Sequence, residues 1–213
     1  MTRSNRSNSE YAFYDRSLKR TSASLGQLGL SVFRNLESGP FDPVFQALEE
    51  ELGEVIIRIR GRGMEKPPGV SLLEISEVKR QRMLGQISIK SAINELYESI
   101  GSLRQEVTAT PSRIQFLGRG GHKSRVLVAM FDESTANQLT DERMQILEVL
   151  EGLAEAPYEF SWLEKKRLCI SLARMSASQV EKATPEARYK IEQSLPPTLA
   201  LHRATLYNPS HGN

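Results

Sequence analysis

The sequence predicts an α+β fold made of two similar halves. Short patterns rich in β-branched residues alternate along the chain with helical patterns of period three and four. Two of the strand patterns share a signature, Gly69-Val70-Ser71-Leu72 and Cys169-Ile170-Ser171-Leu172. A helical pattern follows each of these signature strands, which favours two β-and-α halves that face each other.

The composition is that of an ordinary globular domain. The chain has 213 residues, of which 39% are hydrophobic and 25% charged, and its formal net charge is only +2. Any attraction to nucleic acid must therefore come from a local patch. No stretch reaches the roughly 20 apolar residues that span a bilayer, the N-terminus lacks an apolar signal core, and the single cysteine forms no internal disulfide. We expect a cytoplasmic protein with no membrane partner.

The two ends of the chain differ from its middle. Residues 1–24 are rich in serine, asparagine and arginine, so we expect a disordered basic arm, which either contacts RNA or an acidic partner or is a solvated tail. Residues 25–207 are expected to form a single two-lobed α+β domain. Residues 208–213 form a polar tail.

In the first half, Asp42 and Pro43 begin a helix that Gly53 closes. Strands follow at residues 55–60, where isoleucines alternate with arginines, and at 69–75. A long helix over residues 89–107 is predicted from one apolar stripe, namely Ile89, Ala92, Ile93, Leu96, Ile100 and Leu103.

In the second half, strands at 113–117 and 125–131 flank a glycine-rich connector and predict a β-hairpin. Ser134 or Thr140-Asp141 caps a helix that ends near Leu153. The remaining elements are a strand at 168–173, a helix at 178–195 and a strand at 204–207. Alternation along a strand places Gly69, Ser71 and Leu73 on one face, and Cys169, Ser171 and Ala173 on the matching face of the second signature.

Four segments together carry a family resemblance. They are the two signature strands within 68–73 and 167–174, the hairpin 114–131, and the closing 203–207 with its Thr-Leu-Tyr. Over about residues 41–207 the chain resembles the two-histidine phosphoesterase superfamily, which includes RNA ligase-like proteins and cyclic nucleotide phosphodiesterases. The resemblance implies two similar antiparallel β-sheets that face a central cleft, with the helices outside.

In that family each half supplies a His-x-Thr/Ser strand. One imidazole takes a proton from the attacking hydroxyl, the other protonates the leaving oxygen, and the two hydroxyl residues hold the phosphate. Here Ser71 and Ser171 match the hydroxyl positions, whereas Gly69 and Cys169 occupy the histidine positions. Glycine cannot exchange a proton, and a cysteine is a poor substitute for an imidazole. The resemblance therefore implies a catalytically degenerate protein that binds RNA, a nucleotide or phosphate.

Each of these residues also has a simpler interpretation. Ser71 and Ser171 could pack in a polar seam between the sheets, and Cys169 could be a small buried apolar residue. No group of histidines and cysteines has metal-ligand spacing, so we expect no metal and no cofactor.

Further candidate substrate contacts lie on the hairpin tip and before the second signature. The tip carries positive charge and backbone amides that suit phosphate, or else it is a solvated loop. Two aromatic residues could stack on a base, or else they pack into the core or on the surface. These candidates are Arg119, His122, Lys123, Arg125, Tyr158 and Trp162.

Two alternative functions remain from the sequence. None of the histidines His122, His202 and His211 lies in a His-x-Ser/Thr motif. An active RNA or cyclic-nucleotide phosphodiesterase would therefore have to use a displaced histidine, His122 or His202, together with Ser71 and Ser171. A protein-interaction scaffold could instead dock on a partner through the basic arm. The oligomeric state is left open.

Overall fold

The computed structural model describes residues 28–36, 39–53, 57–58, 69–76, 84–85, 87, 89–118, 124–154 and 167–207. The basic arm, most of the hairpin tip and the polar tail lie outside these residues. The described part combines an antiparallel sheet with helices, which confirms the α+β class. Its elements are β1 (Leu28–Asn35), α2 (Asp42–Leu52), β2 (Ile57–Arg58), β3 (Gly69–Ser76), α4 (Ile89–Ser99), the short 3-10 helix Gly101–Arg104, β4 (Val107–Ala109), β5 (Pro111–Leu117), β6 (Ser124–Phe131), α5 (Glu133–Leu153), β7 (Cys169–Ser176), α7 (Ala177–Glu181), α8 (Pro185–Gln193), β8 (Leu199–Leu201) and β9 (Ala204–Tyr207).

The two halves of the sheet meet at one pair of residues. The main sheet has the order β5-β6-β7-β3-β1-β9, with β2 on the same edge of β7 as β3. β3 and β7 are antiparallel and pair only through Val70 and Ile170, a contact that we call the junction. The two expected sheets are therefore joined into one strongly curved sheet. Strands β4 and β8 form a separate small sheet.

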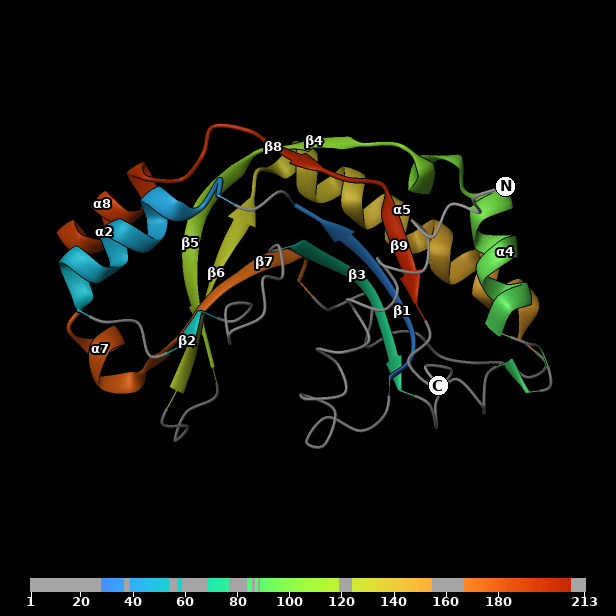
Figure 1. Ribbon diagram of the computed structural model, residues 1–213, viewed down its shortest axis with the longest axis horizontal. Coiled ribbons are helices and arrows are strands. Elements are labelled where there is room, and N and C mark those ends of the chain that lie inside the picture. The colour runs from blue at the N-terminus through green and yellow to red at the C-terminus, as the bar shows by residue number, and fades with distance from the viewer. Residues whose placement is uncertain are drawn as a thin grey trace, which may run out of the picture.

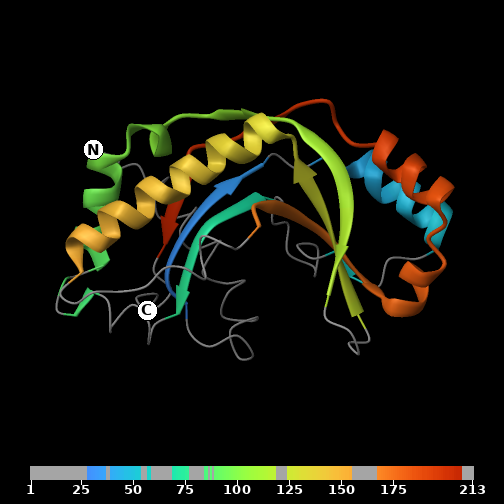
Figure 2. The same cartoon turned by 180° about the vertical axis from the view of Figure 1, so that it is seen from behind.

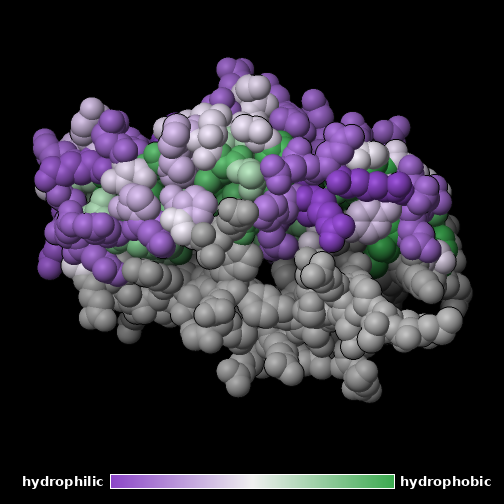
Figure 3. Space-filling view, turned by 45° about the horizontal axis from the view of Figure 1, so that its top comes forward, coloured by the Kyte–Doolittle hydropathy of each residue, from purple (hydrophilic) through white to green (hydrophobic). Residues whose placement is uncertain are grey.

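The helices lie outside the arch that the sheet forms, as Figures 1 and 2 show from opposite sides. Helices α2, α7 and α8 flank the half that contains β5, β6 and β7, whereas α4 and α5 flank the half that contains β1, β3 and β9. The outer surface in Figure 3 is mostly hydrophilic, with hydrophobic residues visible in narrow strips between the elements. No helix of the described residues is both long enough and apolar enough to cross a membrane.

Several predicted helices differ in their ends. The helix expected over 178–195 is split into α7 and α8, because Thr184 caps a new helix through its side chain and Pro185 occupies its first turn. The helix expected over 89–107 ends at Ser99, and residues 107–109 form β4 instead. Gly53 closes α2 with φ 79° as expected, but Phe41 and not Asp42 is its N-cap.

Helix α5 starts earlier than either cap that the sequence suggested. Its N-cap is Asp132, whose Oδ1 accepts a hydrogen bond from the backbone N–H of Thr135 at 2.9 Å. This cap lies two residues before Ser134 and eight before Thr140. Two adjacent charged residues in the middle of the helix, Glu142 and Arg143, are buried at 4% and 2% exposure.

Strand β1 was not predicted at all. It lies between β3 and β9 and pairs with both. Its consecutive residues 30–34 are each exposed by 1% or less. Because both faces of this strand are buried, it lacks the apolar and polar alternation by which a half-exposed strand is found in a sequence.

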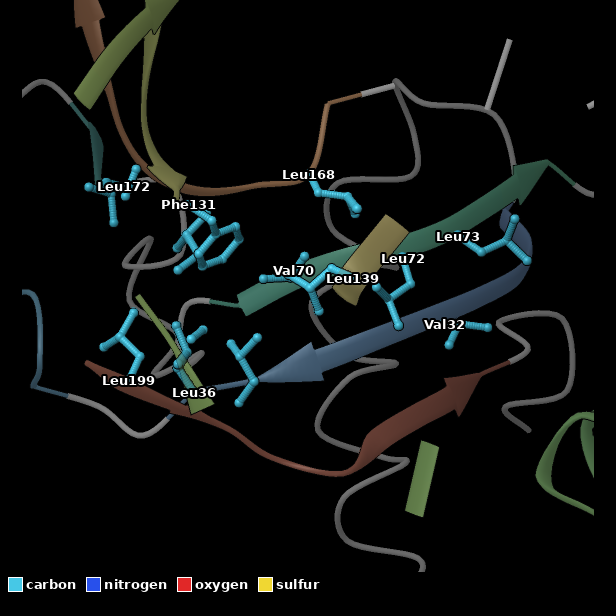
Figure 4. Close-up of a cluster of buried hydrophobic side chains, with 14 of the residues drawn as sticks. Val32, Leu36, Val70, Leu72, Leu73, Phe131, Leu139, Leu168, Leu172 and Leu199 are labelled. Carbon is cyan, nitrogen blue, oxygen red and sulfur yellow. The ribbon is translucent and has the colours of Figure 1, made fainter. Parts of the chain in front are cut away.

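The core fills the space between the sheet and α5. Val70 and Leu72 of β3 lie beside Leu139 of α5, and Phe131 and Leu172 extend the cluster into the other half (Figure 4). Val70 and Leu139 are fully buried. Burial of apolar surface, at about 25 cal/mol per Å², stabilises this packing of α5 on the sheet.

A buried ion pair ties β1 to the outer helices. The guanidinium of Arg34 contacts both carboxylate oxygens of Glu142, with Nε at 2.7 Å from Oε2. Its remaining N–H groups donate to the carbonyls of Ser102, Gln105 and His202 at 2.8–2.9 Å. Every donor of the guanidinium thus has an acceptor, as a charge at 0% exposure requires.

Candidate functional site

The signature residues share one face of the curved sheet. Val70 is paired with Arg34, whose side chain reaches Glu142 of α5, so the Val70 side of the sheet faces the helices. Since side chains alternate along a strand, Gly69 and Ser71 face the other way. We call this second side the inner face. It is the concave side of the arch in Figure 1.

The junction brings the two signatures together on this face. Because Val70 and Ile170 are antiparallel partners, the next positions of the two strands place Ser71 across from Cys169 and Gly69 across from Ser171. The two hydroxyl residues that the sequence paired through a resemblance are thus neighbours, about one or two strand spacings apart.

Both signature strands carry a bulge at the same place. In β3, Ser71 pairs with Phe33 of β1 and Leu73 pairs with the adjacent Val32, so Leu72 has no partner in β1. In β7 the pairing with β6 likewise skips Leu172. The bulge turns the following residues, so Leu73 and Ala173 lie on the helix side and not beside the serines, as simple alternation predicted.

Gly69 is packed against its neighbouring strand. A Cβ atom at this position would lie 2.2 Å from the carbonyl oxygen of Arg34 and 2.4 Å from Cε1 of Phe33. Phe33 is 1% exposed, and its ring lies where a side chain at position 69 would stand. Glycine is therefore required here by the close approach of β1, and the ring covers it.

Cys169 has a more open environment. It is half-buried, and its Sγ lies 4.0 Å from the carbonyl oxygen of Arg167, within the range of a weak hydrogen bond to sulfur. Arg167 is exposed and donates from NH1 to Oε1 of Gln115 at 2.9 Å. The second signature strand thus begins with a thiol on a partly accessible part of the inner face.

The two serines differ in exposure of their hydroxyls. Both residues are half-buried. The Oγ of Ser71 is buried and has no hydrogen-bond partner among the described residues. An unsatisfied buried hydroxyl costs about 1–3 kcal/mol, so this donor favours any ligand oxygen or water that reaches it.

Arg143 supplies positive charge from behind the junction. Its Nε donates to the carbonyl oxygen of Leu72 at 2.8 Å, and its NH2 donates to the carbonyl oxygen of Ser71 at 3.3 Å. These two carbonyls at the bulge thus have hydrogen-bond donors from α5. Burial lowers the pKa of this guanidinium, and the charge of an ionised Cys169 opposes that shift.

The other predicted contacts are not gathered at this place. Arg125 lines a groove on the helix side of the sheet, with Phe116 and Arg188, and its side chain covers Gly118. The remaining candidates lie outside the described residues, namely Arg119, His122, Lys123, Tyr158 and Trp162, as does His211. In the part of the chain that the structure describes, no histidine, cysteine and acidic side chains are grouped to hold a metal ion.

His202 has a carboxylate partner that the sequence did not suggest. Its Nδ1 lies 3.3 Å from Oε2 of Glu106, a residue 96 positions away. The backbone N–H of His202 donates to the carbonyl oxygen of Asn35, which is opposite Gly69 in the sheet. His202 thus lies at the bend between β8 and β9, and β1 separates it from the first signature strand.

No protein-family model matches this chain, and no curated protein matches it. Solved structures do match its fold. The structure of Kluyveromyces marxianus Usb1 with uridine monophosphate superimposes with a TM-score of 0.56 at 13% identity, covering 86% of this chain and 95% of that chain. A second structure of Kluyveromyces marxianus Usb1 gives 0.55 at 12% identity, covering 87% and 95%.

This match concerns the fold. It agrees with the two-lobed α+β architecture that the resemblance to two-histidine phosphoesterases implies. Phe33 and Arg143, which shape the two signature positions, were missed by sequence reasoning. The only local signal was Gly69 itself, since a glycine inside a strand pattern indicates a close approach of another backbone.

Proposed function

We propose that the inner face at the junction binds a nucleotide or the end of an RNA strand through Ser71 and Ser171, and that it does not cleave a phosphodiester by the two-imidazole route. The observation that carries this proposal is the packing at Gly69. Position 69 has no room for an acid or base, because even a Cβ would overlap a backbone oxygen at 2.2 Å. A reaction that needs two groups titrating near neutral pH lacks one of them here.

The pair of hydroxyls supports the binding half of the proposal. Ser71 and Ser171 lie on one face on either side of the junction, and the Oγ of Ser71 lacks a hydrogen-bond partner among the described residues. A serine hydroxyl donates to a phosphate oxygen without any acid–base role. The guanidinium of Arg143 lies behind the same strands and favours an anionic ligand.

The fold gives independent support. The inner face of this chain belongs to an architecture shared with a protein solved with uridine monophosphate. Because the identity is only 13%, the likeness suggests the class of ligand and not the chemistry done on it.

Amide NMR titration with uridine monophosphate and 2',3'-cyclic uridine monophosphate tests both halves. We expect shift changes centred on Ser71 and Ser171 and no product. Ser71→Ala and Ser171→Ala should each weaken binding about tenfold or more, since a hydrogen bond to a charged group contributes about 1.5–3 kcal/mol. Ser99→Ala, an exposed serine on α4, is the matched control. Unperturbed amides at millimolar ligand would remove the binding half, and turnover would remove the other.

One observation favours an alternative, an active phosphodiesterase that uses a displaced imidazole. His202 and Glu106 form a His–carboxylate pair at 3.3 Å, of the kind that orients a general base. Hydrolysis of cyclic phosphates that is lost in His202→Ala, but kept in an Arg104→Ala control, would support this alternative. Inactivity of the unmodified chain on a panel of cyclic phosphates would exclude it.

A further inference from the structure

A groove of about 730 Å³ lies between the edge strand β5 and helices α7 and α8, and its lining includes residues from both faces of β5. Its lining is rich in arginine, with Arg113, Arg125 and Arg188, and it contains one carboxylate, Glu192. The nearly neutral chain therefore concentrates positive charge at this place.

Aromatic rings accompany these cations. The guanidinium of Arg188 stands over the ring of Phe116, 5.4 Å from its centroid. Tyr189 lines the same groove and is 62% exposed, the most exposed large hydrophobic residue of the described part. Arginines beside an exposed ring are the elements that single-stranded nucleic acid uses, one for its phosphates and the other for its bases.

The edge of β5 is closed to an added peptide strand. The backbone N–H of Ile114 points away from β6 and donates to Oε1 of Glu192 at 3.1 Å. Pairing of an extended peptide with β5 would need this donor. The carboxylate of Glu192 thus holds the edge of β5 and does not face a ligand. The groove therefore favours a ligand that is recognised by side chains over a peptide that pairs with the backbone of β5.

Two residues of the groove lining share rows of the sheet with residues of the inner face. Gln115 lines the groove and stands in one row of the sheet with Val128 and Ser171. Arg113 lines it too and stands in the row of Met130 and Cys169. Two strand spacings, about 10 Å, separate each pair of end residues. The groove lining therefore begins about two strand spacings from Ser171 and Cys169.

We propose that this groove is a second contact surface for single-stranded RNA, which holds the part of the strand that leaves the inner face. The choice of RNA rests on the function proposed above, but the groove is tested separately.

Fluorescence anisotropy with labelled oligouridylates of two lengths tests the proposal. The long probe has about ten nucleotides, within the usual site size of single-strand binders, and the short probe is a dinucleotide. The double variant Arg113→Ala/Arg188→Ala should weaken long-probe binding at least tenfold. It should also lower the salt dependence of log K by about 1.4, which is two lost phosphate contacts at about 0.7 each. Tyr189→Ala should weaken the long probe about tenfold through lost stacking.

Three comparisons make the result decisive. Arg104→Ala, an exposed arginine in the other half, should leave both probes unchanged, and the groove variants should leave the dinucleotide unchanged. Ser171→Ala should weaken both probes, so failure at the inner face and failure at the groove give different patterns. Long-probe affinity and salt dependence that are unaltered in the double variant would overturn the proposal. So would no binding of the long probe, or a polyglutamate that binds the groove as tightly as RNA.

Discussion

Strands β3 and β7 begin alike but treat their first position in different ways. Both have a serine two residues on, and both have a bulge at the leucine after it. At β3, however, Phe33 and the backbone of Arg34 pack directly on Gly69. At β7 the thiol of Cys169 is half-buried, and its Sγ lies 4.0 Å from the carbonyl oxygen of Arg167. Position 69 is closed by packing, whereas position 169 keeps room for a side chain.

This difference separates the two positions physically. At β7 only the side chain of Cys169 itself fills its position. At β3 the neighbouring strand fills the space, so the packing involves β1 as well as residue 69. A larger side chain would therefore act very differently at the two positions.

The largest effect is expected from Arg34, which holds the strand that closes Gly69. Arg34→Met leaves the carboxylate of Glu142 buried without its partner, and should lower the free energy of unfolding by about 3–5 kcal/mol. Arg167→Ala, at the exposed arginine on the β7 side, should stay within about 0.5 kcal/mol. Urea unfolding measures both. Equal effects of the two substitutions would remove the asymmetry between the halves.

The next effect concerns the two signature positions directly. Gly69→Ala should cost about 3 kcal/mol, the upper end for overpacking, because the contacting atoms include backbone. Gly69→His should cost at least as much, whereas Cys169→Ala and Cys169→His should cost less than about 1.5 kcal/mol. Gly152→Ala in α5 is the matched control, since a Cβ there meets nothing within 4 Å and helix propensity improves. A Gly69→His variant with unchanged thermal stability would contradict the packing argument.

The sequence predicted the signature strands and the closing strand closely. β9 has the expected bounds, and β3 starts at the expected Gly69, because these patterns are local. The fate of Gly69 could not be predicted in this way. It depends on Phe33, which belongs to a strand whose two buried faces conceal its period, and which pairs with β3 across almost 40 positions of the chain.

The bulges had a similar consequence. Leu73 and Ala173 follow the alternation of an ideal strand in the sequence, and only the pairing with β1 and β6 reveals that they turn to the helix side. Likewise, the helix that contains Arg143 was predicted from the sequence, but the contact of Arg143 with the junction was not. Its role at the junction follows from the packing of α5 on β3.

The smallest effect is a dependence of stability on pH at the start of α5, the helix that positions Arg143. Hydrogen bonds from the side chain and the backbone N–H of Thr135 lower the pKa of Asp132 below its ordinary value. The stabilisation of the folded state by ionised Asp132 is therefore fully present above about pH 4, and it is lost as the pH falls through the lowered pKa. In Asp132→Asn this part of the acid-induced loss should disappear, while the amide still caps the helix. An unchanged acid profile would contradict this assignment.

Phosphorus NMR of 2',3'-cyclic uridine monophosphate with an equimolar amount of the chain tests the central claim most directly, because one spectrum reports both binding and cleavage. We predict that the signal of the cyclic phosphate shifts or broadens, that Ser71→Ala and Ser171→Ala reduce this change, and that its integrated intensity stays constant over many hours. The appearance of a phosphate monoester signal in proportion to the protein, or a cyclic phosphate signal that the protein leaves unmoved, would contradict the account.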